Sequence, residues 1–155
     1  MLDNLDIKIL SLLQLNGRKK RNEIAEAVGL SLPSVSERLN KLEEKGFLEG
    51  YYAKLNRKAF GYDIMAYIQV IMDSSKNYEK LIDNVKRIPT ILECHSVLGE
   101  GSHLLKAVVK NTEALEKLLG EIQSWPGVTA TKTTFVLSTI KETTELELKK
   151  DLINK

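Results

Sequence analysis

Four side chains that can bind metal ions lie close together in the sequence: Cys94, His95, Glu100 and His103. Zinc sites need clustered ligands at fixed spacing, and adjacent residues of a strand point to opposite faces. Because Cys94 and His95 are adjacent in a β-prone run, we expect them to diverge, and we predict no metal site and no cofactor. The chain has no glycine-rich phosphate loop, Ser/His/Asp arrangement or isolated carboxylate pair, so we predict that it is not an enzyme.

A second set of polar side chains is organised by helical spacing in the run GLSLPSVSERLNKLEEKGFLEGY, residues 29–51. Apolar residues recur there at i, i+4 and i+7, which predicts one buried helix side: Val35, Leu39 and Leu42. One flank of the same helix carries hydroxyl and basic groups: Ser34, Lys41, Lys45 and, at its edge, Arg38. Small hydroxyls let a helix approach DNA closely, and Arg and Lys reach bases or phosphates. We favour insertion into DNA, with a solvated helix face as the alternative.

The chain has 23 Lys and Arg residues and 21 Asp and Glu residues, a net charge of only +2. Any DNA contact must therefore come from a local cluster of basic residues. The basic run from Arg18 to Arg21 precedes the second predicted helix, where a flanking DNA strand would pass; the alternative is a solvated loop. The predicted DNA-binding residues come from this run and from the third helix: Arg18, Lys19, Arg21, Ser34, Ser36, Glu37, Arg38 and Lys41.

Three short helices must hold these residues in place. Asp3 is a plausible N-cap for the first, which ends at Gly17; Asn22 caps a second that ends at Gly29; and Ser31 caps a third that ends at Gly46. Three short helices with a tight glycine turn before the last predict a helix-turn-helix domain. The aromatic run at 47–55 predicts a short strand after it, in the manner of a winged helix.

The rest of the chain predicts alternating strands and helices. Strands are expected at 63–72, 91–98, 104–110 and 128–140, and helices at 78–88 and 112–122. The order βαββαβ is typical of a ferredoxin-like unit, with two helices on one face of a four-stranded antiparallel sheet. We therefore predict an α+β protein with a helix-turn-helix domain at 1–55, a linker at 56–62 and a ferredoxin-like domain at 63–155.

The other face of that sheet carries surplus apolar side chains, which a second copy of the chain would bury. We therefore predict a homodimer that presents two DNA-reading helices to a palindromic operator; the alternative is a monomer with a mildly apolar sheet face. One cysteine, no charged leader with an apolar core and no membrane-spanning apolar run together predict a cytoplasmic protein that is not bound to a membrane. The predicted DNA binding would place it on the nucleoid.

Motifs in both predicted domains resemble those of the Lrp/AsnC, or feast/famine, transcriptional regulators. In the first domain the resemblance rests on Leu2 Asp3 to Asp6, Ile9 Leu10, Gly17 Arg18, Glu23 Ile24 Ala25, Val28 to Ser31, Val35, Arg38, Leu42 Glu43, Gly46 Phe47 Leu48 and Gly50 Tyr51. In the second it rests on Glu93 Cys94 His95, Val97, Gly99, Leu104 Leu105 Lys106 and Pro126 Gly127 Val128. The resemblance implies dimers that assemble further, for example to octamers, and amino acids bound between regulatory domains.

Members of this family often show Gly-Asp-x-Asp where this chain has Gly99 to His103. An amino acid needs an acceptor for its ammonium group and donors for its carboxylate, which Glu100 and the glycine amides could supply. The residues that the resemblance implies for effector binding are Gly99, Glu100, Gly101, Ser102, His103, Thr133 and Thr134. The alternative is a simple glycine turn of a hairpin.

The sequence thus predicts a sequence-specific transcriptional regulator whose DNA binding responds to a small effector, an amino acid by resemblance. Two alternatives remain open. One is a tetrapyrrole decarboxylase like the siroheme-processing proteins that resemble this two-domain form, and the other is an architectural DNA binder without an effector.

Overall fold

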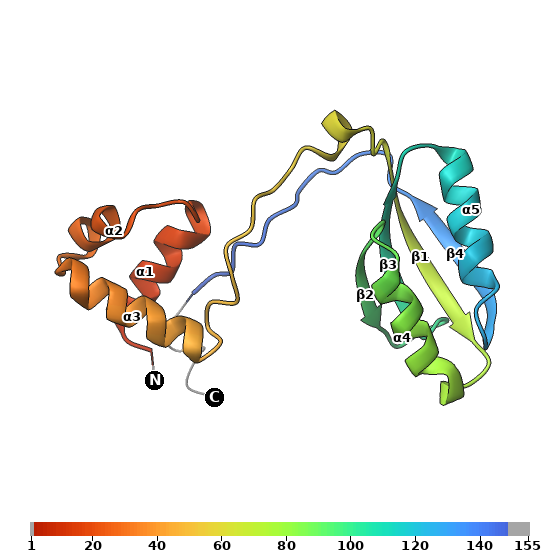
Figure 1. Cartoon of the computed structure of the whole chain (residues 1–155), viewed down its shortest axis with the longest axis horizontal. Helices are drawn as coiled ribbons and strands as arrows, with labels where there is room; N and C mark the ends of the chain where they lie inside the picture. Colours follow the sequence, from red (N-terminus) through yellow and green to blue (C-terminus); the bar gives the residue numbers. More distant parts are fainter. Residues whose placement is uncertain (1, 149–155) are drawn as a thin grey trace. The chain divides into compact units, whose positions relative to one another are not determined.

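The computed structural model describes residues 2–148 and divides them into two units (Figure 1). Within the described residues, the helical unit contains residues 2–54 and 141–148, and the sheet unit covers Leu55–Ile140. Across residues 2–148, no helix is long and apolar enough to cross a membrane.

The helical unit is built from α1 (Asn4–Leu15), α2 (Arg21–Val28) and α3 (Leu32–Glu44). Asp3 caps α1 as predicted, accepting hydrogen bonds from the backbone N–H groups of Leu5 (2.8 Å) and Asp6 (2.9 Å). Ser31 caps α3 as predicted, accepting from the N–H of Ser34. The predicted cap Asn22 is wrong, because Lys20 occupies the cap position of α2 and donates its N–H to Glu23.

The apolar faces of the three helices meet in one core, as their spacing predicts. Its buried members are Leu2, Ile9, Leu10, Leu13, Ile24, Ala25, Val28, Val35, Leu39 and Leu42. Gly29 adopts a left-handed conformation, with φ 72°, and makes the tight turn between α2 and α3. The predicted helix-turn-helix is therefore confirmed.

The strand predicted at 47–55 does not form. The N–H groups of Phe47 and Leu48 both return to the carbonyl of Leu42, at 2.9 and 3.2 Å, so this run begins as the closing turn of α3. A strand also needs a neighbouring strand to pair its backbone N–H and C=O groups. Within residues 2–148, the only paired strands are the four strands of the sheet unit.

The segment from Lys141 to Leu148 belongs to the helical unit, although the sequence placed it in the second domain. The side-chain amide of Gln14 donates to the carbonyl of Leu146 at 3.0 Å and accepts from the N–H of Leu146 at 2.7 Å. Leu148 packs against the helical core. These contacts hold the segment against the helical unit, and no local sequence pattern predicts them.

The sheet unit contains β1 (Ile64–Met72), α4 (Tyr78–Arg87), β2 (Ile91–Ser96), β3 (His103–Val109), α5 (Thr112–Gln123) and β4 (Val128–Phe135), with short 3-10 helices at Arg57–Phe60 and Ser75–Asn77. The strands form one antiparallel sheet in the order β2-β3-β1-β4. The α+β class and the βαββαβ order are confirmed. The last strand ends at Phe135, whereas the sequence extended it to Ile140.

Helices α4 and α5 cover one face of this sheet (Figure 1). The core between them contains Ile64, Ile68, Val70, Leu81, Ile91, Leu105, Ala107, Val109, Leu118, Ile122 and Trp125. Side chains alternate along a strand and directly paired residues share a face. Tyr67 and Gln69 of β1 therefore point to the opposite, helix-free face, together with Thr134 and Lys132, their partners on β4.

Candidate nucleic-acid interface and effector loop

Helix α3 presents the polar surface that the sequence predicts. Its apolar side chains Val35, Leu39 and Leu42 are buried, and Glu37 and Lys41 on the outside are exposed. Ser34 and Ser36 are half-buried, and the hydroxyl groups of Ser31 and Ser34 lie 2.9 Å apart. The start of α3 is therefore lined by small hydroxyl side chains, where the partial positive charge of the helix favours anions.

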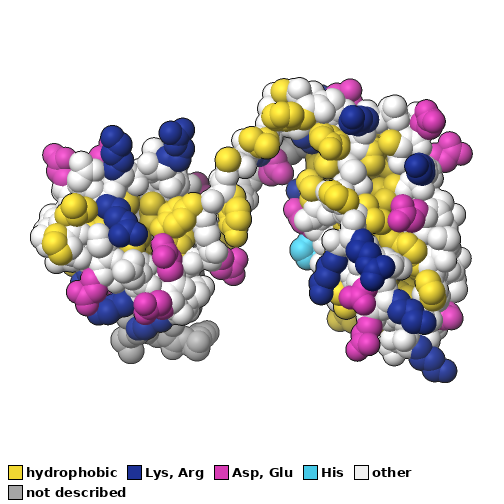
Figure 2. Space-filling view, in the orientation of Figure 1, with side chains coloured by type: hydrophobic (Ala, Val, Ile, Leu, Met, Phe, Trp, Pro, Cys, Tyr) yellow, Lys and Arg dark blue, Asp and Glu magenta, His cyan; other side chains and the backbone are white. Residues whose placement is uncertain are grey.

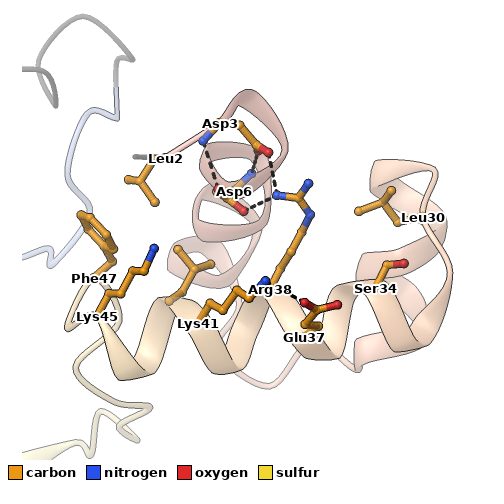
Figure 3. A pocket seen from close by; sticks show the side chains of 11 residues that line it. Leu2, Asp3, Asp6, Leu30, Ser34, Glu37, Arg38, Lys41, Lys45 and Phe47 are labelled. Atoms are coloured by element: carbon orange, nitrogen blue, oxygen red, sulfur yellow. Dashed lines mark hydrogen bonds and ion pairs between the residues drawn. The ribbon is translucent and has the colours of Figure 1, made fainter.

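A cavity of about 430 Å³ lies beside the start of α1 and the flank of α3 (Figure 3). Its lining mixes acids, bases and apolar groups: Leu2, Asp3, Asp6, Leu30, Ser34, Glu37, Arg38, Lys41, Leu42, Lys45 and Phe47. In Figure 3 Arg38 reaches from α3 towards the two aspartates at the start of α1, whereas Lys41 extends along α3.

Arg38 lies against α1 and not on a free flank. Its Nη1 donates to Asp3 Oδ2 at 2.7 Å and to Asp6 Oδ1 at 2.6 Å, and its side chain is 29% exposed. These hydrogen bonds raise the pKa of Arg38. The pKa of Asp3 is lowered mainly by the hydrogen bond from the Asp6 backbone N–H, and also by the hydrogen bond and positive charge of Arg38. The charge that the sequence assigned to DNA is thus held by two carboxylates.

The other bases of the predicted DNA surface are more accessible. Lys41 pairs with Glu37 at 2.6 Å, one helical turn away, and the hydrogen bond from Lys41 lowers the pKa of Glu37. Arg18 and Arg21 are exposed and Lys19 is half-buried at the junction of α1 and α2. Acidic and basic side chains are interspersed on the face seen in Figure 2, in keeping with the small net charge.

The loop between β2 and β3 leans onto the helix-free face of the sheet. Glu100 forms an ion pair with Lys132 of β4, whose hydrogen bond lowers the pKa of the Glu100 carboxyl. Lys132 lies directly opposite Gln69 of β1. Gly101 packs so tightly that a Cβ there would lie 2.6 Å from Gln69 Cγ and 2.8 Å from the carbonyl of Val70. The backbone approach therefore requires glycine.

Ser102 and His103, two of the predicted effector residues, are directed away from the helix-free face. The Ser102 hydroxyl lies 2.8 Å from His103 Nδ1, and the His103 ring meets the Tyr78 ring edge-on, with centroids 4.8 Å apart. His103 is only 4% exposed, and its burial lowers the pKa of the imidazole. It is part of the packing between β3 and α4.

The two threonines of β4 lie on opposite faces. Thr133 pairs with Ile68 and therefore faces the helices, whereas Thr134 pairs with Tyr67 and faces away from them. The structure thus brings Glu100, Gly101 and Thr134 to one face and separates Thr133 from them. Lys132 lies on that face as well. Sequence reasoning missed it, although its spacing of two from Thr134 in a predicted strand would have placed the two together.

The residues first considered as metal ligands do not converge. Cys94 pairs with Leu105 and His95 with Leu104, which puts them on opposite faces as predicted. His95 lies 3.4 Å from Glu93, and burial raises the pKa of the half-buried Cys94 thiol. Among residues 2–148, no three His, Cys, Asp or Glu side chains are grouped so that they could hold a metal ion.

Comparisons with known proteins match both units. The family described as "Lrp/AsnC ligand binding domain" matches residues 65–146, and the one described as "Winged helix-turn-helix DNA-binding" matches residues 2–49. The regulator FL11 of Pyrococcus horikoshii is 37% identical over 148 residues, which cover 96% of this chain and 97% of that protein. The leucine-responsive regulatory protein of Escherichia coli is 34% identical over 151 residues, covering 96% and 92%.

The fold is also similar to that of solved structures. A transcriptional regulator from Neisseria meningitidis, crystallised as a complex with L-Met, superposes with a TM-score of 0.91 at 34% identity. The likeness covers 98% of this chain and 99% of that one. Both units therefore have counterparts in the same relatives.

Proposed function

The chain belongs to the Lrp/AsnC family of helix-turn-helix transcriptional regulators, and from this premise we propose that α3 enters an operator and that an amino acid binds beside Glu100. The observation that carries the proposal is the pairing of an acid and a base, Glu100 with Lys132, beneath a glycine loop on the helix-free face. Neither unit is proposed to have a catalytic role. The proposed location is the cytoplasm, on the nucleoid.

The proposed DNA contacts come from the accessible polar groups of the helical unit. Ser34 and Ser36 mark the start of α3, and Lys41 lies one to two turns further on the exposed side. Hydroxyl groups and helix N-termini suit phosphate oxygens, and lysine reaches phosphates or guanine edges. Arg18 and Arg21 supply further exposed charge at the start of α2. These groups support binding to double-stranded DNA.

The proposed effector is a zwitterion because the site offers both charges. The Glu100 carboxylate can accept from an ammonium group, and the Lys132 ammonium can donate to a carboxylate. The backbone N–H groups of the loop and the Thr134 hydroxyl add polar partners on the same face. The complex of the Neisseria meningitidis regulator with L-Met makes methionine the first amino acid to test.

The helix-free face of the sheet supports a homodimer. Tyr67, in the middle of β1, is 36% exposed on this face, and further along the same face the side chains of Leu104 and Ile71 are only partly buried. A second copy would remove this apolar surface from water and place two α3 helices on a twofold axis, as a palindromic operator requires. Because Glu100 and Lys132 share the face, effector binding and assembly would be linked. Higher assemblies such as octamers would be built from such dimers.

The test is selection of bound fragments from genomic DNA, with and without a mixture of amino acids, followed by salt-dependent binding measurements on one fragment. The proposal expects palindromic fragments, an affinity that falls steeply with salt, and a set of fragments that changes with amino acids. No enrichment over unselected DNA would refute the DNA-binding role. Enrichment that is identical with and without amino acids would refute the effector role and indicate an architectural DNA binder.

A further inference from the structure

We propose that Arg38 is a positioning residue, which serves DNA binding by fixing α3 against the start of α1 and does not itself touch DNA. The inference rests on the proposed role of α3 as the DNA-reading helix. Helical spacing predicts Arg38 as a direct DNA contact, and this inference replaces that role. It also makes two acidic residues, Asp3 and Asp6, necessary for DNA binding, although acidic side chains repel DNA.

The geometry is that of a clamp between two helices. A single nitrogen, Nη1 of Arg38, bonds both Asp3 and Asp6, at 2.7 and 2.6 Å. The same two carboxylates form the capping box of α1, in which Asp3 accepts from the Asp6 backbone and Asp6 from the Asp3 backbone. Arg38 therefore bonds to groups whose own positions are set by the backbone at the helix start. Asp6 is 13% exposed, which shields its contact from solvent.

The clamp lies beside a hollow between α1 and α3. The cavity of about 430 Å³ lies between the start of α1 and the flank of α3, and Arg38 reaches across it (Figure 3). Apolar contacts hold α1 and α3 together in the core of the helical unit, but side chains that line a hollow have fewer partner atoms on that side. The two charge-assisted hydrogen bonds of Arg38 join the two helices across this hollow.

The charge balance argues against a direct DNA contact. Arg38 carries one positive charge and its partners carry two negative ones, so the trio presents a net negative charge to a phosphate. Moving the guanidinium onto DNA would leave Asp3 and Asp6 without their cation at the cap of α1. The exposed Lys41, in contrast, can extend toward DNA without breaking the Arg38 contacts between α1 and α3.

The experiment measures DNA affinity against salt concentration for the full chain and for Arg38→Gln, Arg38→Lys and Asp6→Asn, on a fragment that the unmodified protein binds. A positioning role predicts that all three variants bind about tenfold more weakly or worse, with an unchanged slope of log K against log salt. Asp6→Asn is decisive, because removing an acid from a DNA-binding protein should tighten binding if only charge mattered. Glu44→Gln is the matched control, since it removes an exposed acid from the same helix outside the clamp, and should not weaken binding.

Opposite results would overturn the inference. If Arg38 contacts a phosphate, Arg38→Gln will lower the slope by about 0.9, Arg38→Lys will keep most of the affinity, and Asp6→Asn will bind more tightly. Thermal unfolding of the single variants and of the double variant Arg38→Gln/Asp6→Asn gives a second readout. The clamp predicts that the second substitution adds little to the first, and additive losses would contradict it. If the unmodified chain binds no DNA fragment, the proposed function itself fails, and this inference fails with it.

Discussion

Glu100 and Lys132 form an ion pair that joins the loop after β2 to the middle of β4. The side chains are 72% and 56% exposed, so water and salt screen their attraction and the pair adds little to stability. An exposed pair of this kind can be opened by a ligand that satisfies both charges. An amino acid would give its ammonium group to Glu100 and its carboxylate to Lys132.

Neutralising either member of this pair should therefore reduce amino-acid binding without reducing DNA binding. We expect Glu100→Gln and Lys132→Met to diminish the rise in melting temperature that L-methionine produces, because each removes one charge partner. The 2-oxo acid and the amine related to methionine, which each carry one charge, should bind the unmodified protein more weakly than methionine. Glu116→Gln, an exposed substitution on α5, is the control. An undiminished methionine response in Glu100→Gln would remove that residue from the site.

The glycine at the base of the loop gives a second prediction. In Gly101→Ala the new methyl group would meet Gln69 and the Val70 carbonyl, and a backbone carbonyl cannot move aside cheaply. We expect a loss of about 1–3 kcal/mol in unfolding free energy from overpacking, and a weaker methionine response because the loop is displaced. Gly120→Ala on α5 is the matched control: beyond its chain neighbours and the backbone of its own helix, nothing lies within 4 Å of its Cβ position, so it should stabilise the helix. Denaturant unfolding of both variants tests the contrast in sign.

Sequence spacing was sufficient for features that depend on near neighbours. The apolar repeats of Val35, Leu39 and Leu42, and the caps Asp3 and Ser31, depend on residues a few positions apart, and the structure confirms them. The antiparallel sheet follows from the order of its strands and helices. Apolar periodicity and capping residues are visible in a short stretch of sequence, so such elements can be predicted from it.

Features that depend on distant partners were beyond the sequence. Helical spacing placed Arg38 at the edge of the helix side predicted to contact DNA. It could not predict the hydrogen bonds from Arg38 to Asp3 and Asp6, because these residues lie 35 and 32 positions away in the sequence. The strand expected at 47–55 does not form for a related reason: the run contains β-prone residues, but a strand forms only with a neighbouring strand.

The helix-free face predicts the behaviour of a third variant. Tyr67→Glu would put a charge in the middle of the proposed dimer face, where burial without a partner is costly. We expect the molecular mass measured by analytical ultracentrifugation to fall towards that of a monomer, with weaker operator binding because two linked α3 helices become one. Ile82→Glu on α4 is the control, since Ile82 is exposed to a similar degree, 39% against 36%, on the other side of the sheet. A Tyr67→Glu variant with unchanged mass would place any interface elsewhere.

The buried imidazole of His103 gives a fourth prediction, on the pH dependence of stability. Burial lowers its pKa in the folded chain below the ordinary value of 6.5. Between these two pKa values the unfolded chain binds more protons, so the unfolding free energy should be full above pH 6.5 and fall as pH drops through this window. His103→Phe keeps a ring against Tyr78 but cannot titrate, and should flatten that part of the curve. Chemical denaturation from pH 7.5 to 5 tests it, and equal slopes in both proteins would contradict it.

Lys41 is the residue of α3 for which a direct DNA contact is expected, and its behaviour should contrast with that of Arg38. Its only described ion pair is with exposed Glu37 on the same helix, so its release leaves the joint between α1 and α3 intact. Lys41→Ala should weaken operator binding by about 1–3 kcal/mol if the contact is to a base. If the contact is to a phosphate, the salt slope should fall by about 0.9. Fluorescence anisotropy over a salt series distinguishes these cases, with the exposed Lys80→Ala on α4 as control. Binding by Lys41→Ala that matches the control at every salt concentration would show that this side of α3 does not face DNA.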